Sequence, residues 1–224
     1  VVSKIRPDLL HCTSNTAPIH CPVPLVLTLH DIIFLEPRQG GNRSWYQNMG
    51  WYYRRMVVPR ILSQCEKIIT VSHFECNRIR EALQLPKDKI TAIYNGYSEH
   101  FRPLSETLSI TRKYIDDDDY IFFLGNTDPK KNVARTLKAY SLYLKQSDKK
   151  RPLLIADLSK DKLDAILREQ QIEEIKPYLS YPGYIPNKDL AYLYNGAFVF
   201  LYTSLRESFG IPMLEAMACG TPVI

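Results

Sequence analysis

The sequence predicts an α/β fold with two doubly wound, Rossmann-like halves, and two observations lead to this fold class. Short apolar runs with few charges recur along the chain with helical patterns between them, which is typical of buried parallel sheets. The pattern lapses once, over 98–119, where a proline and a run of aspartates occur, and then resumes. We therefore expect two domains, at 1–103 and 104–224, both incomplete in this chain.

The first half is predicted to contain four strands, at 8–12, 25–29, 67–71 and 90–94. Ser72 and Glu75 form a capping box after the third strand, in which each side chain satisfies one free backbone N–H. The helix that this box opens is expected to run to about Leu85, because Pro86 follows. The last strand should end at the turn dipeptide Asn95–Gly96.

The second half is predicted to repeat this organisation. One helix presents an apolar face, and another follows Asn187, a favourable N-cap residue. Ligands of open α/β sheets bind at the carboxyl ends of the strands, so the site is expected there, in a cleft between the halves. The strands are expected at 120–124, 153–156, near 181 and at 198–202, and the apolar helix face consists of Val133, Leu137, Tyr140 and Leu144.

Composition narrows the class of protein. With 224 residues, 45% of them hydrophobic, the chain can fill a sizeable core, which excludes disordered and fibrous classes. No apolar run approaches the roughly 18 residues of a membrane-spanning helix. The net charge of +5 favours anionic ligands or an acidic membrane surface. The five cysteines show no C-x-x-C spacing, so a reducing, cytoplasmic location is expected, without disulfides or a zinc site.

The two ends indicate an internal piece of a longer protein. Residues 1–6 are typical of the tail of a helix that runs into a strand, and 221–224 are typical of an opening strand. We expect the native polypeptide to extend in both directions, or another chain to complete the sheets. The lack of a targeting peptide in this sequence then carries little information.

Functional residues are densest just past 198–202, from Ser204 to Glu215. A helix is predicted to begin here, because Pro212 suits the first helical position, where its missing N–H needs no partner. Glu215 would then fall in the first turn and point back toward the loop that holds Glu207. Both carboxylates are expected to reach one ligand. The alternative is that Glu215 only complements the helix dipole and Glu207 is a solvated loop residue.

The same loop offers backbone N–H groups beside the positive end of the predicted helix. This combination binds anions and hydroxyls, and a sugar diphosphate would fit it. The donors belong to Ser208, Phe209 and Gly210.

This block and several others are spaced along nearly the whole chain. They are the stretch from Glu207 to Ile224 with its two glutamates, residues 182–197, Val71–Ser72 with Tyr94–Gly96, and His30–Asp31. In this order they resemble the family 4 retaining glycosyltransferases of the GT-B fold, with their E-x7-E block. The block from Gly125 to Asn132 is similar to that of the mannosyltransferase subgroup of the family.

The resemblance implies a role for each residue of the loop. Glu215 would hold the ribose hydroxyls of a nucleotide-sugar donor, and Glu207 a hydroxyl of the transferred sugar. Phe209, Gly210 and Ile211 would offer backbone N–H groups to the sugar and the diphosphate. Carboxylates accept hydrogen bonds from hydroxyls well, and backbone donors bind phosphate without a countercharge. No cofactor beyond the donor substrate is expected.

A second block, Gly125 to Asn132, follows a predicted strand and precedes a helix. Relatives commonly carry G-R-x-x-x-x-K here, with the arginine and the lysine gripping the diphosphate. Lys131 matches that lysine, whereas Asn126 stands where the arginine would be. The mannosyltransferase subgroup has roughly G-x-x-x-P-R-K-N, which would make Lys130 the second cation. The alternative is that both lysines are solvated on a surface loop.

His30 is the remaining candidate for chemistry. It stands at the tip of an apolar strand, followed by Asp31, and it would donate to a sugar hydroxyl or to the developing charge. The alternative is a histidine held in a turn by its neighbour. The resemblance favours a place in the cleft, opposite the Glu207 loop.

The aspartate run at 116–119 contains a formal D-x-D, the metal-binding signature of a different glycosyltransferase fold. It precedes a strand and therefore lies at the amino end of that strand, where donors are not expected to bind. We predict no metal ligation here.

Residues 44–62 are rich in aromatic and basic side chains. One interpretation is a helix face that rests on anionic headgroups, since tryptophan and tyrosine favour the membrane interface and arginine binds phosphate. The other is a long helix packed on the sheet with its aromatics in the core, broken near Pro59. The second is preferred, because hydrophobic residues occur nearly all round this helix.

The predicted function is a retaining, metal-independent hexosyltransferase that uses a nucleotide diphosphate sugar in polysaccharide synthesis. The acceptor would be a hydroxyl of a glycan or a lipid-linked glycan, at the inner face of the membrane; no nucleic-acid partner is expected. His30, Lys131 and Glu207 are the candidate catalytic residues. The alternatives are a GT-B epimerase or phosphorylase, and a catalytically silent module that binds nucleotide or glycan.

Overall fold

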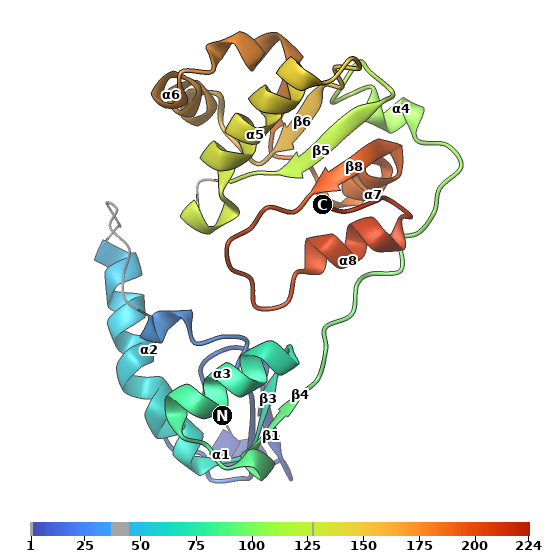
Figure 1. Ribbon diagram of the computed structural model, residues 1–224. Coiled ribbons are helices and arrows are strands. Elements are labelled where there is room, and N and C mark those ends of the chain that lie inside the picture. The colour runs from blue at the N-terminus through green and yellow to red at the C-terminus, as the bar shows by residue number, and fades with distance from the viewer. Residues whose placement is uncertain (1, 37–44, 127) are drawn as a thin grey trace. The chain divides into compact units, whose positions relative to one another are not determined.

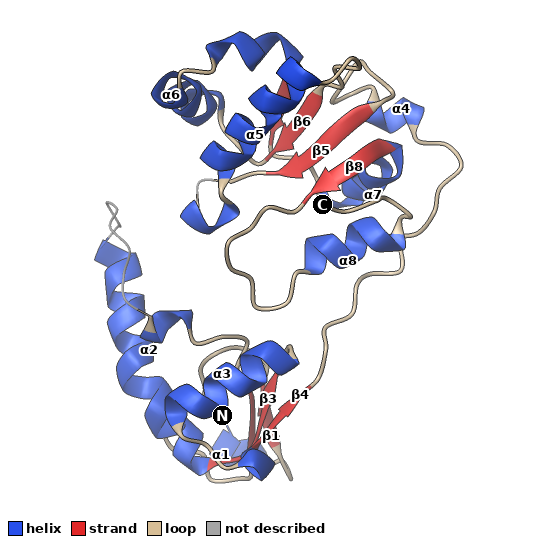
Figure 2. Cartoon of the chain, in the orientation of Figure 1, coloured by secondary structure: helices blue, strands red, loops and turns tan. Residues whose placement is uncertain are grey.

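The computed structural model describes residues 2–36, 45–126 and 128–224. The chain divides into two compact units, Val1–Asn95 and Gly96–Ile224, and each is built on a parallel sheet with helices packed against it (Figures 1 and 2). The α/β fold class predicted from the sequence is therefore correct.

The first unit carries a four-stranded sheet in the order β1-β2-β3-β4, and every pair is parallel. Each observed strand end lies within two residues of its predicted position. The strands are β1 (Leu10–Cys12), β2 (Leu25–Thr28), β3 (Cys65–Thr70) and β4 (Ile90–Ala92). The helices are α1 (Val2–Ile5), η1 (Ile33–Leu35), α2 (Trp45–Gln64), α3 (His73–Leu83) and η2 (Lys87–Lys89).

Helix α3 begins as the sequence predicts, at the N-cap Ser72. The Ser72 hydroxyl accepts a hydrogen bond from the Glu75 backbone N–H at 3.1 Å, which is one half of the expected capping box. The helix ends at Leu83, two residues before the predicted end. Gln84 adopts the left-handed conformation with φ 52° and stops the helix ahead of Pro86.

The second unit carries a four-stranded parallel sheet in the order β7-β6-β5-β8. The strands are β5 (Tyr120–Leu124), β6 (Leu153–Ala156), β7 (Leu179–Gly183) and β8 (Ala197–Leu201). The helices are α4 (Leu108–Thr111), η3 (Pro129–Lys131), α5 (Val133–Gln146), α6 (Lys160–Gln170), η4 (Glu173–Tyr178), α7 (Asn187–Gly196) and α8 (Ile211–Ala218).

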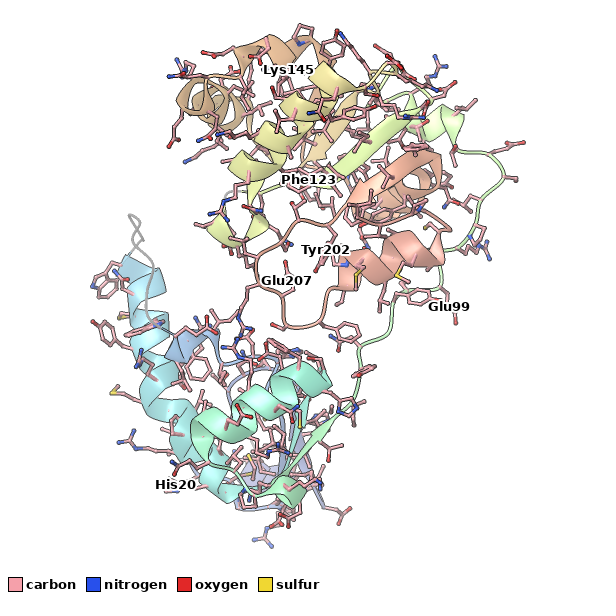
Figure 3. The ribbon with its side chains drawn as sticks, in the orientation of Figure 1. His20, Glu99, Phe123, Lys145, Tyr202 and Glu207 are labelled. Carbon is pink, nitrogen blue, oxygen red and sulfur yellow. The ribbon has the colours of Figure 1, made fainter. Side chains whose placement is uncertain are left out.

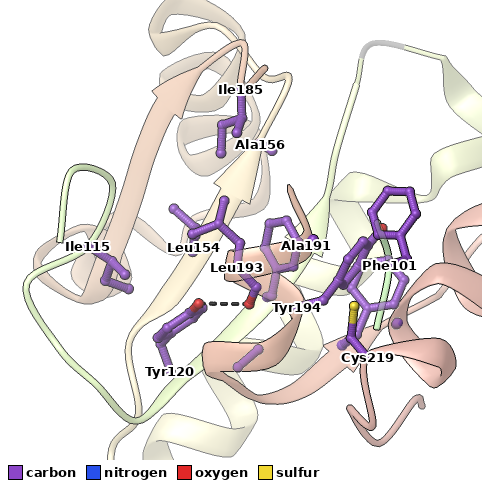
Figure 4. Close-up of a cluster of buried hydrophobic side chains, with 14 residues drawn as sticks. Phe101, Ile115, Tyr120, Leu154, Ala156, Ile185, Ala191, Leu193, Tyr194 and Cys219 are labelled. Carbon is purple, nitrogen blue, oxygen red and sulfur yellow. Dashed lines mark hydrogen bonds between the residues drawn. The ribbon is translucent and has the colours of Figure 1, made fainter. Parts of the chain in front are cut away.

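Strand β5 explains why this sheet is covered on both faces. Its side chains alternate, so Tyr120 and Phe122 join a core cluster with α7 and α8, and Ile121 and Phe123 join another with α5 and α6. In the first cluster the buried Tyr120 hydroxyl donates to the Leu193 carbonyl at 2.7 Å (Figure 4). The two cores fix the register of β5, and with it the position of the loop that follows.

The division between the units falls earlier in the chain than the predicted boundary at 103/104. The segment just before that boundary packs on the second unit: Phe101 is 2% exposed, against Tyr194 of α7. Asn195 fixes the same segment, because its side chain accepts from the Leu104 N–H and donates to the Arg102 carbonyl. A stretch rich in polar residues thus belongs to the second unit through a few specific contacts.

Two predicted helix starts are wrong by one residue. Asn187 is the first residue of α7 rather than its N-cap, and Pro186 precedes it. Helix α8 begins at Ile211, one residue before the predicted start at Pro212. The reason is that Gly210, with φ 98°, is the residue at which the chain turns into the helix. Pro212 is therefore the second helical residue, and Glu215 opens the second turn instead of lying in the first.

The predicted strand at 221–224 pairs in parallel with β8 as an isolated bridge between Phe200 and Val223. The Phe200 N–H donates to the Pro222 carbonyl, and the Ile224 N–H donates to the Phe200 carbonyl. This pairing places the segment beside β8.

Candidate functional site

Two loops at the carboxyl edge of the second unit's sheet are bonded to each other. One follows β5 and contains η3; the other follows β8 and leads to α8. The Leu205 N–H donates to the Lys130 carbonyl at 2.8 Å, and the Asn132 side-chain amide donates to the Thr203 carbonyl at 3.2 Å. The hydroxyls of Thr136 and Thr203 lie 2.6 Å apart. Adjacent strands thus bring together two loops that the sequence separates widely.

This junction places two predicted cations beside a predicted carboxylate. The Lys131 ammonium donates to Glu207 Oε1 at 2.7 Å, and Lys130 Nζ lies 3.7 Å from Glu207 Oε2. The side chains of Lys131 and Glu207 are only 15% and 21% exposed. At this degree of burial, water and salt screen the pair weakly. The interpretation of Lys131 and Glu207 as separately solvated residues is therefore wrong.

The pKa of Glu207 is lowered although burial acts in the opposite direction. Burial raises the pKa of this carboxyl, but the hydrogen bond and charge of Lys131, the charge of Lys130 and a hydrogen bond from Ser204 outweigh it. Glu207 is therefore an ionised carboxylate at neutral pH.

Glu215 lies in a different environment on α8. Its Oε2 accepts a hydrogen bond from the Tyr194 hydroxyl at 3.4 Å. Burial raises the pKa of Glu215, and the Tyr194 hydrogen bond and the charge of His100 offset only part of that effect. Glu215 has a weakly paired carboxyl and Glu207 a strongly paired one, which suits them to different parts of a ligand.

The loop residues between the two glutamates lead into the amino end of α8, where the helix dipole is positive. Ser208 and Phe209 precede Gly210, and Ile211 is the first helical residue. Gly210 is required here for two reasons: its φ is 98°, and a Cβ would lie 3.0 Å from the Tyr202 hydroxyl oxygen.

Gly125 and Asn126 shape the other loop. The Gly125 N–H donates to the Ala156 carbonyl, and a Cβ at Gly125 would lie 3.1 Å from Ile155 Cγ2. The Asn126 side-chain oxygen accepts from the Asp128 N–H at 2.9 Å. Asn126, which stands where relatives carry arginine, thus stabilises a turn, and its contact with a diphosphate stays a prediction.

His30 follows β2 at the carboxyl edge of the first unit's sheet. Its backbone N–H donates to Asn15 Oδ1 at 2.8 Å, and its Nε2–H donates to the Thr13 carbonyl at 2.9 Å. A neutral ring held in this way carries its free lone pair on Nδ1. The loop after β1 therefore orients His30, whose catalytic role stays a prediction.

Comparison with known families decides what kind of chain carries this site. Residues 108–224 match the family described as Glycosyl transferases group 1, and residues 1–100 match Glycosyltransferase Family 4. The chain belongs to the family 4 glycosyltransferases. The resemblance noted from its sequence motifs is confirmed.

Curated relatives of this glycosyltransferase chain include enzymes named for O-antigen chains. It is 31% identical over 203 residues to O-antigen chain mannosyltransferase B of Escherichia coli, covering 89% of this chain and 52% of the relative. It is 27% identical to O-antigen chain mannosyltransferase RfbU of Salmonella typhimurium, covering 100% and 58%. The chain thus spans about half the length of these relatives.

Solved structures share the fold of this glycosyltransferase chain. Sucrose-phosphate synthase from Thermosynechococcus elongatus matches with TM-score 0.74 at 19% identity, over 99% of this chain and 56% of that one. WaaG, a glycosyltransferase of lipopolysaccharide biosynthesis, matches with TM-score 0.70 at 12% identity, over 99% and 60%. The GT-B fold class is confirmed, and the glycosyltransferase chain covers part of that fold.

The aspartate run of the glycosyltransferase chain is occupied by basic partners. Asp118 binds Arg112 through two hydrogen bonds, at 3.0 and 2.9 Å, and Asp119 binds Arg151 at 2.6 Å. The run precedes β5, at the amino end of the sheet. Among the described residues, no group of three or more histidine, cysteine, aspartate or glutamate side chains could hold a metal ion.

Sequence reasoning missed Tyr202 and Tyr194. Tyr202 directly follows β8, and its ring centroid lies 5.9 Å from Lys131 Nζ. Tyr194 falls within the block at 182–197 and was given no role of its own, yet its hydroxyl reaches Glu215. A hydroxyl on an otherwise apolar pattern is the signal that was available in both cases.

Helix α2 was interpreted either as a membrane-surface helix or as a helix packed in the core, and neither interpretation holds along its whole length. The expected break near Pro59 is wrong, because the helix continues through it. Its second half is core, since Val58 and Ile61 are fully buried. Its first half leaves a stripe of large side chains in solvent at helical spacing, and in Figure 1 these turns extend beyond the sheet of their unit. The stripe consists of Trp45, Met49, Tyr52 and Met56, which are 74%, 47%, 60% and 59% exposed. Ser44 lies outside the described residues.

Proposed function

We propose that the polypeptide containing this chain is a retaining hexosyltransferase that uses a nucleotide diphosphate sugar and needs no metal ion. The ion pair of Lys131 with Glu207, at the carboxyl edge of the sheet and beside the amino end of α8, carries this proposal. It brings together a cation that can bind a diphosphate and a carboxylate that can accept hydrogen bonds from sugar hydroxyls. Both lie where water and salt screen charges weakly.

Each side chain has a distinct task in this proposal. Lys131 and Lys130 bind the diphosphate together with the N–H groups from Ser208 to Ile211. Glu207 accepts a hydroxyl of the transferred sugar. Glu215, on α8, accepts hydrogen bonds from the ribose hydroxyls, and Nδ1 of His30, in the first unit, accepts one from a sugar hydroxyl, because its Nε2–H is bonded to Thr13. Gly125, directly after β5, contacts the donor through its backbone.

The reaction follows from where negative charge develops. When the bond between the anomeric carbon and the diphosphate breaks, the new charge lies on the leaving phosphate oxygen. Lys131 and the loop N–H groups stabilise that charge without rearranging. The acceptor oxygen bonds to the anomeric carbon on the face from which the diphosphate leaves, and the leaving phosphate oxygen takes the acceptor proton, so the configuration at the anomeric carbon is retained.

The names of the relatives support mannose as the first sugar to test and a polysaccharide as the product. Two curated relatives are named O-antigen chain mannosyltransferases. The acceptor in this proposal is a hydroxyl of a growing glycan, free or attached to a lipid carrier, at the cytoplasmic face of the membrane.

Contact with an anionic membrane is part of the proposal and rests on α2. The helix carries three arginines and no acidic residue, and its exposed stripe combines tryptophan, tyrosine and methionine. Such a surface suits the interface of an anionic bilayer. Among the described residues, no helix has the length and apolar composition needed to cross a bilayer.

A donor panel tests the proposed function. The purified native polypeptide is incubated with UDP-, GDP- and ADP-sugars and a lipid-linked glycan acceptor, and products are followed by mass spectrometry and NMR. We expect transfer from one donor class with retained anomeric configuration, and at least ~100-fold slower transfer by Lys131→Ala because the phosphate loses a stabilising donor. Conversion of the donor without transfer would favour an epimerase, phosphate-dependent release of a sugar phosphate would favour a phosphorylase, and nucleotide binding without turnover would favour a silent module.

A further inference from the structure

We propose that the ion pair of Lys131 with Glu207 is a resting arrangement, and that donor binding exchanges its partners. The donor diphosphate takes Lys131, and the Tyr202 hydroxyl then donates to the Glu207 carboxylate. Tyr202 is thus a positioning residue for Glu207. This inference rests on the proposed function, because it assigns what happens to the same site when the diphosphate arrives.

The first argument is the competition for one cation. In this structure Lys131 and Lys130 both face Glu207, at 2.7 and 3.7 Å. A diphosphate brings further negative charge to the same two lysines. Water and salt screen this site weakly. A phosphate oxygen there would therefore repel the Glu207 carboxylate and attract the two lysines away from it. A partly buried carboxylate that loses its partner requires another donor.

The second argument is the hydroxyl of Tyr202. Its oxygen is buried, and it has no hydrogen-bond partner among the residues that the structure describes. Buried hydroxyls normally form hydrogen bonds, so a buried hydroxyl without one needs an explanation. Figure 3 shows Tyr202 and Glu207 together on the segment that follows β8. Burial raises the pKa of Tyr202, and the charge of Glu207 raises it further, so the phenol keeps the proton it would donate.

The third argument is the space around this hydroxyl. A Cβ on Gly210 would lie 3.0 Å from the Tyr202 oxygen, so the glycine leaves the hydroxyl in contact with bare backbone of the loop. The Tyr202 ring also lies 5.9 Å from Lys131 Nζ. Tyr202 therefore contacts both sides of the arrangement, the lysine and the loop that carries Glu207, and a small shift of that loop would allow the new hydrogen bond.

A double-mutant cycle on nucleotide binding tests the exchange. The affinity of the native polypeptide for GDP, UDP and ADP is measured by calorimetry, and the tightest of the three is then used with Tyr202→Phe, Glu207→Gln and the double variant. We expect Glu207→Gln to bind several-fold more tightly, because Lys131 no longer has to leave a carboxylate. We expect Tyr202→Phe to bind several-fold more weakly, because Glu207 then keeps only the hydrogen bond from Ser204, and to have little effect in the Glu207→Gln background.

Tyr143→Phe is the matched control, since Tyr143 donates to the Lys149 carbonyl near the amino end of the sheet. It should leave nucleotide affinity unchanged. Thermal denaturation of each variant identifies any that fail to fold, and the conservative Tyr202→Phe change removes only one oxygen.

Three results would overturn the exchange. If Tyr202→Phe only raises the melting temperature and leaves affinity unchanged, the hydroxyl is a structural defect without a role. If its effect is the same in both backgrounds, Tyr202 acts independently of Glu207. If Glu207→Gln weakens binding, the ion pair is not displaced. In each case the wild type still binds nucleotide and the proposed function stands, whereas a wild type that binds none of the three nucleotides would remove both proposals.

Discussion

At the scale of single residues, the two glutamates of the site have pKa values shifted in opposite directions by the same kind of environment. Both carboxyls are partly buried, and burial raises the pKa of each. Glu207 has two lysines as partners and its pKa is lowered, whereas Glu215 has Tyr194 and its pKa is raised. Because their environments differ, we expect substitution of Glu207 and substitution of Glu215 to have different effects.

Replacing Glu215 by alanine should weaken nucleotide binding. Charge-assisted hydrogen bonds to the ribose contribute on the order of 1.5–3 kcal/mol, which corresponds to a loss of roughly ten- to hundred-fold in affinity. Isothermal titration calorimetry with the nucleoside diphosphate measures this loss of affinity. Glu169→Ala, at an exposed position of α6, is the control and should change nothing. Glu207→Ala should lower turnover without weakening nucleotide binding; equal losses for both glutamates would contradict this division of roles.

The ion pair of Glu207 should stabilise the fold in a pH-dependent way. The pKa of Glu207 is held below its ordinary value of 4.5, so the unfolded chain takes up this proton more readily than the folded one. The stabilisation is therefore complete above about pH 4.5 and is lost as the pH falls through the folded pKa. We expect the melting temperature of the wild type to exceed that of Glu207→Gln at pH 7, and the gap to close in acid. A constant gap would show that the carboxylate charge contributes nothing.

At the scale of elements, the start of α8 depends on a glycine that the backbone requires. Alanine at Gly210 would sit at φ 98° with its Cβ 3.0 Å from the Tyr202 hydroxyl. The left-handed conformation alone costs about 1–2 kcal/mol for a residue with a side chain, so Gly210→Ala should destabilise the protein by at least that amount. Chemical denaturation measures the change.

Gly50, inside α2, is the matched comparison for Gly210. A Cβ there meets nothing within 4 Å, so Gly50→Ala should stabilise by about 0.5–1 kcal/mol. If both substitutions destabilise to the same extent, the conformation of Gly210 is not the cause.

The exposed stripe of α2 should bind anionic vesicles. Burying a large apolar side chain contributes about 1.5–3 kcal/mol, so replacing both Trp45 and Tyr52 by glutamate should abolish co-sedimentation with phosphatidylglycerol vesicles. Wild-type binding should weaken in high salt and with phosphatidylcholine alone. Leu142→Glu, at a 52% exposed site on α5, is the control and should bind like the wild type. Loss of a dimer by the double variant, with no vesicle binding by the wild type, would instead assign the stripe to self-association.

At the scale of the whole molecule, charge balance governs the reaction. The diphosphate charge is met by Lys131, Lys130 and the amino end of α8 in the proposed function, so transfer should survive EDTA at close to its full rate. The rate of transfer with and without chelator measures it. Complete loss that manganese restores would contradict the mechanism and direct attention back to the aspartates at 116–119.

How much the sequence determines is visible in individual strands. The bounds of β5 and β6 match the prediction, because a continuous apolar run in a parallel sheet is a local signal with clear ends. The capping serine at Ser72 is local in the same way. The starts of α7 and α8 were misplaced by one residue, since backbone conformations at Pro186 and Gly210 decide them.

The sequence by itself determined the fold class, the strands and the residue types at the site, because hydrophobic period, turn residues and motif spacing act over short distances along the chain. Only the tertiary structure decided the partners. Lys131 and Glu207 are 76 residues apart, and they meet because β5 and β8 are neighbours in the sheet. The structure likewise decided that α2 is core in one half and exposed in the other, since burial depends on where the sheet beneath the helix ends.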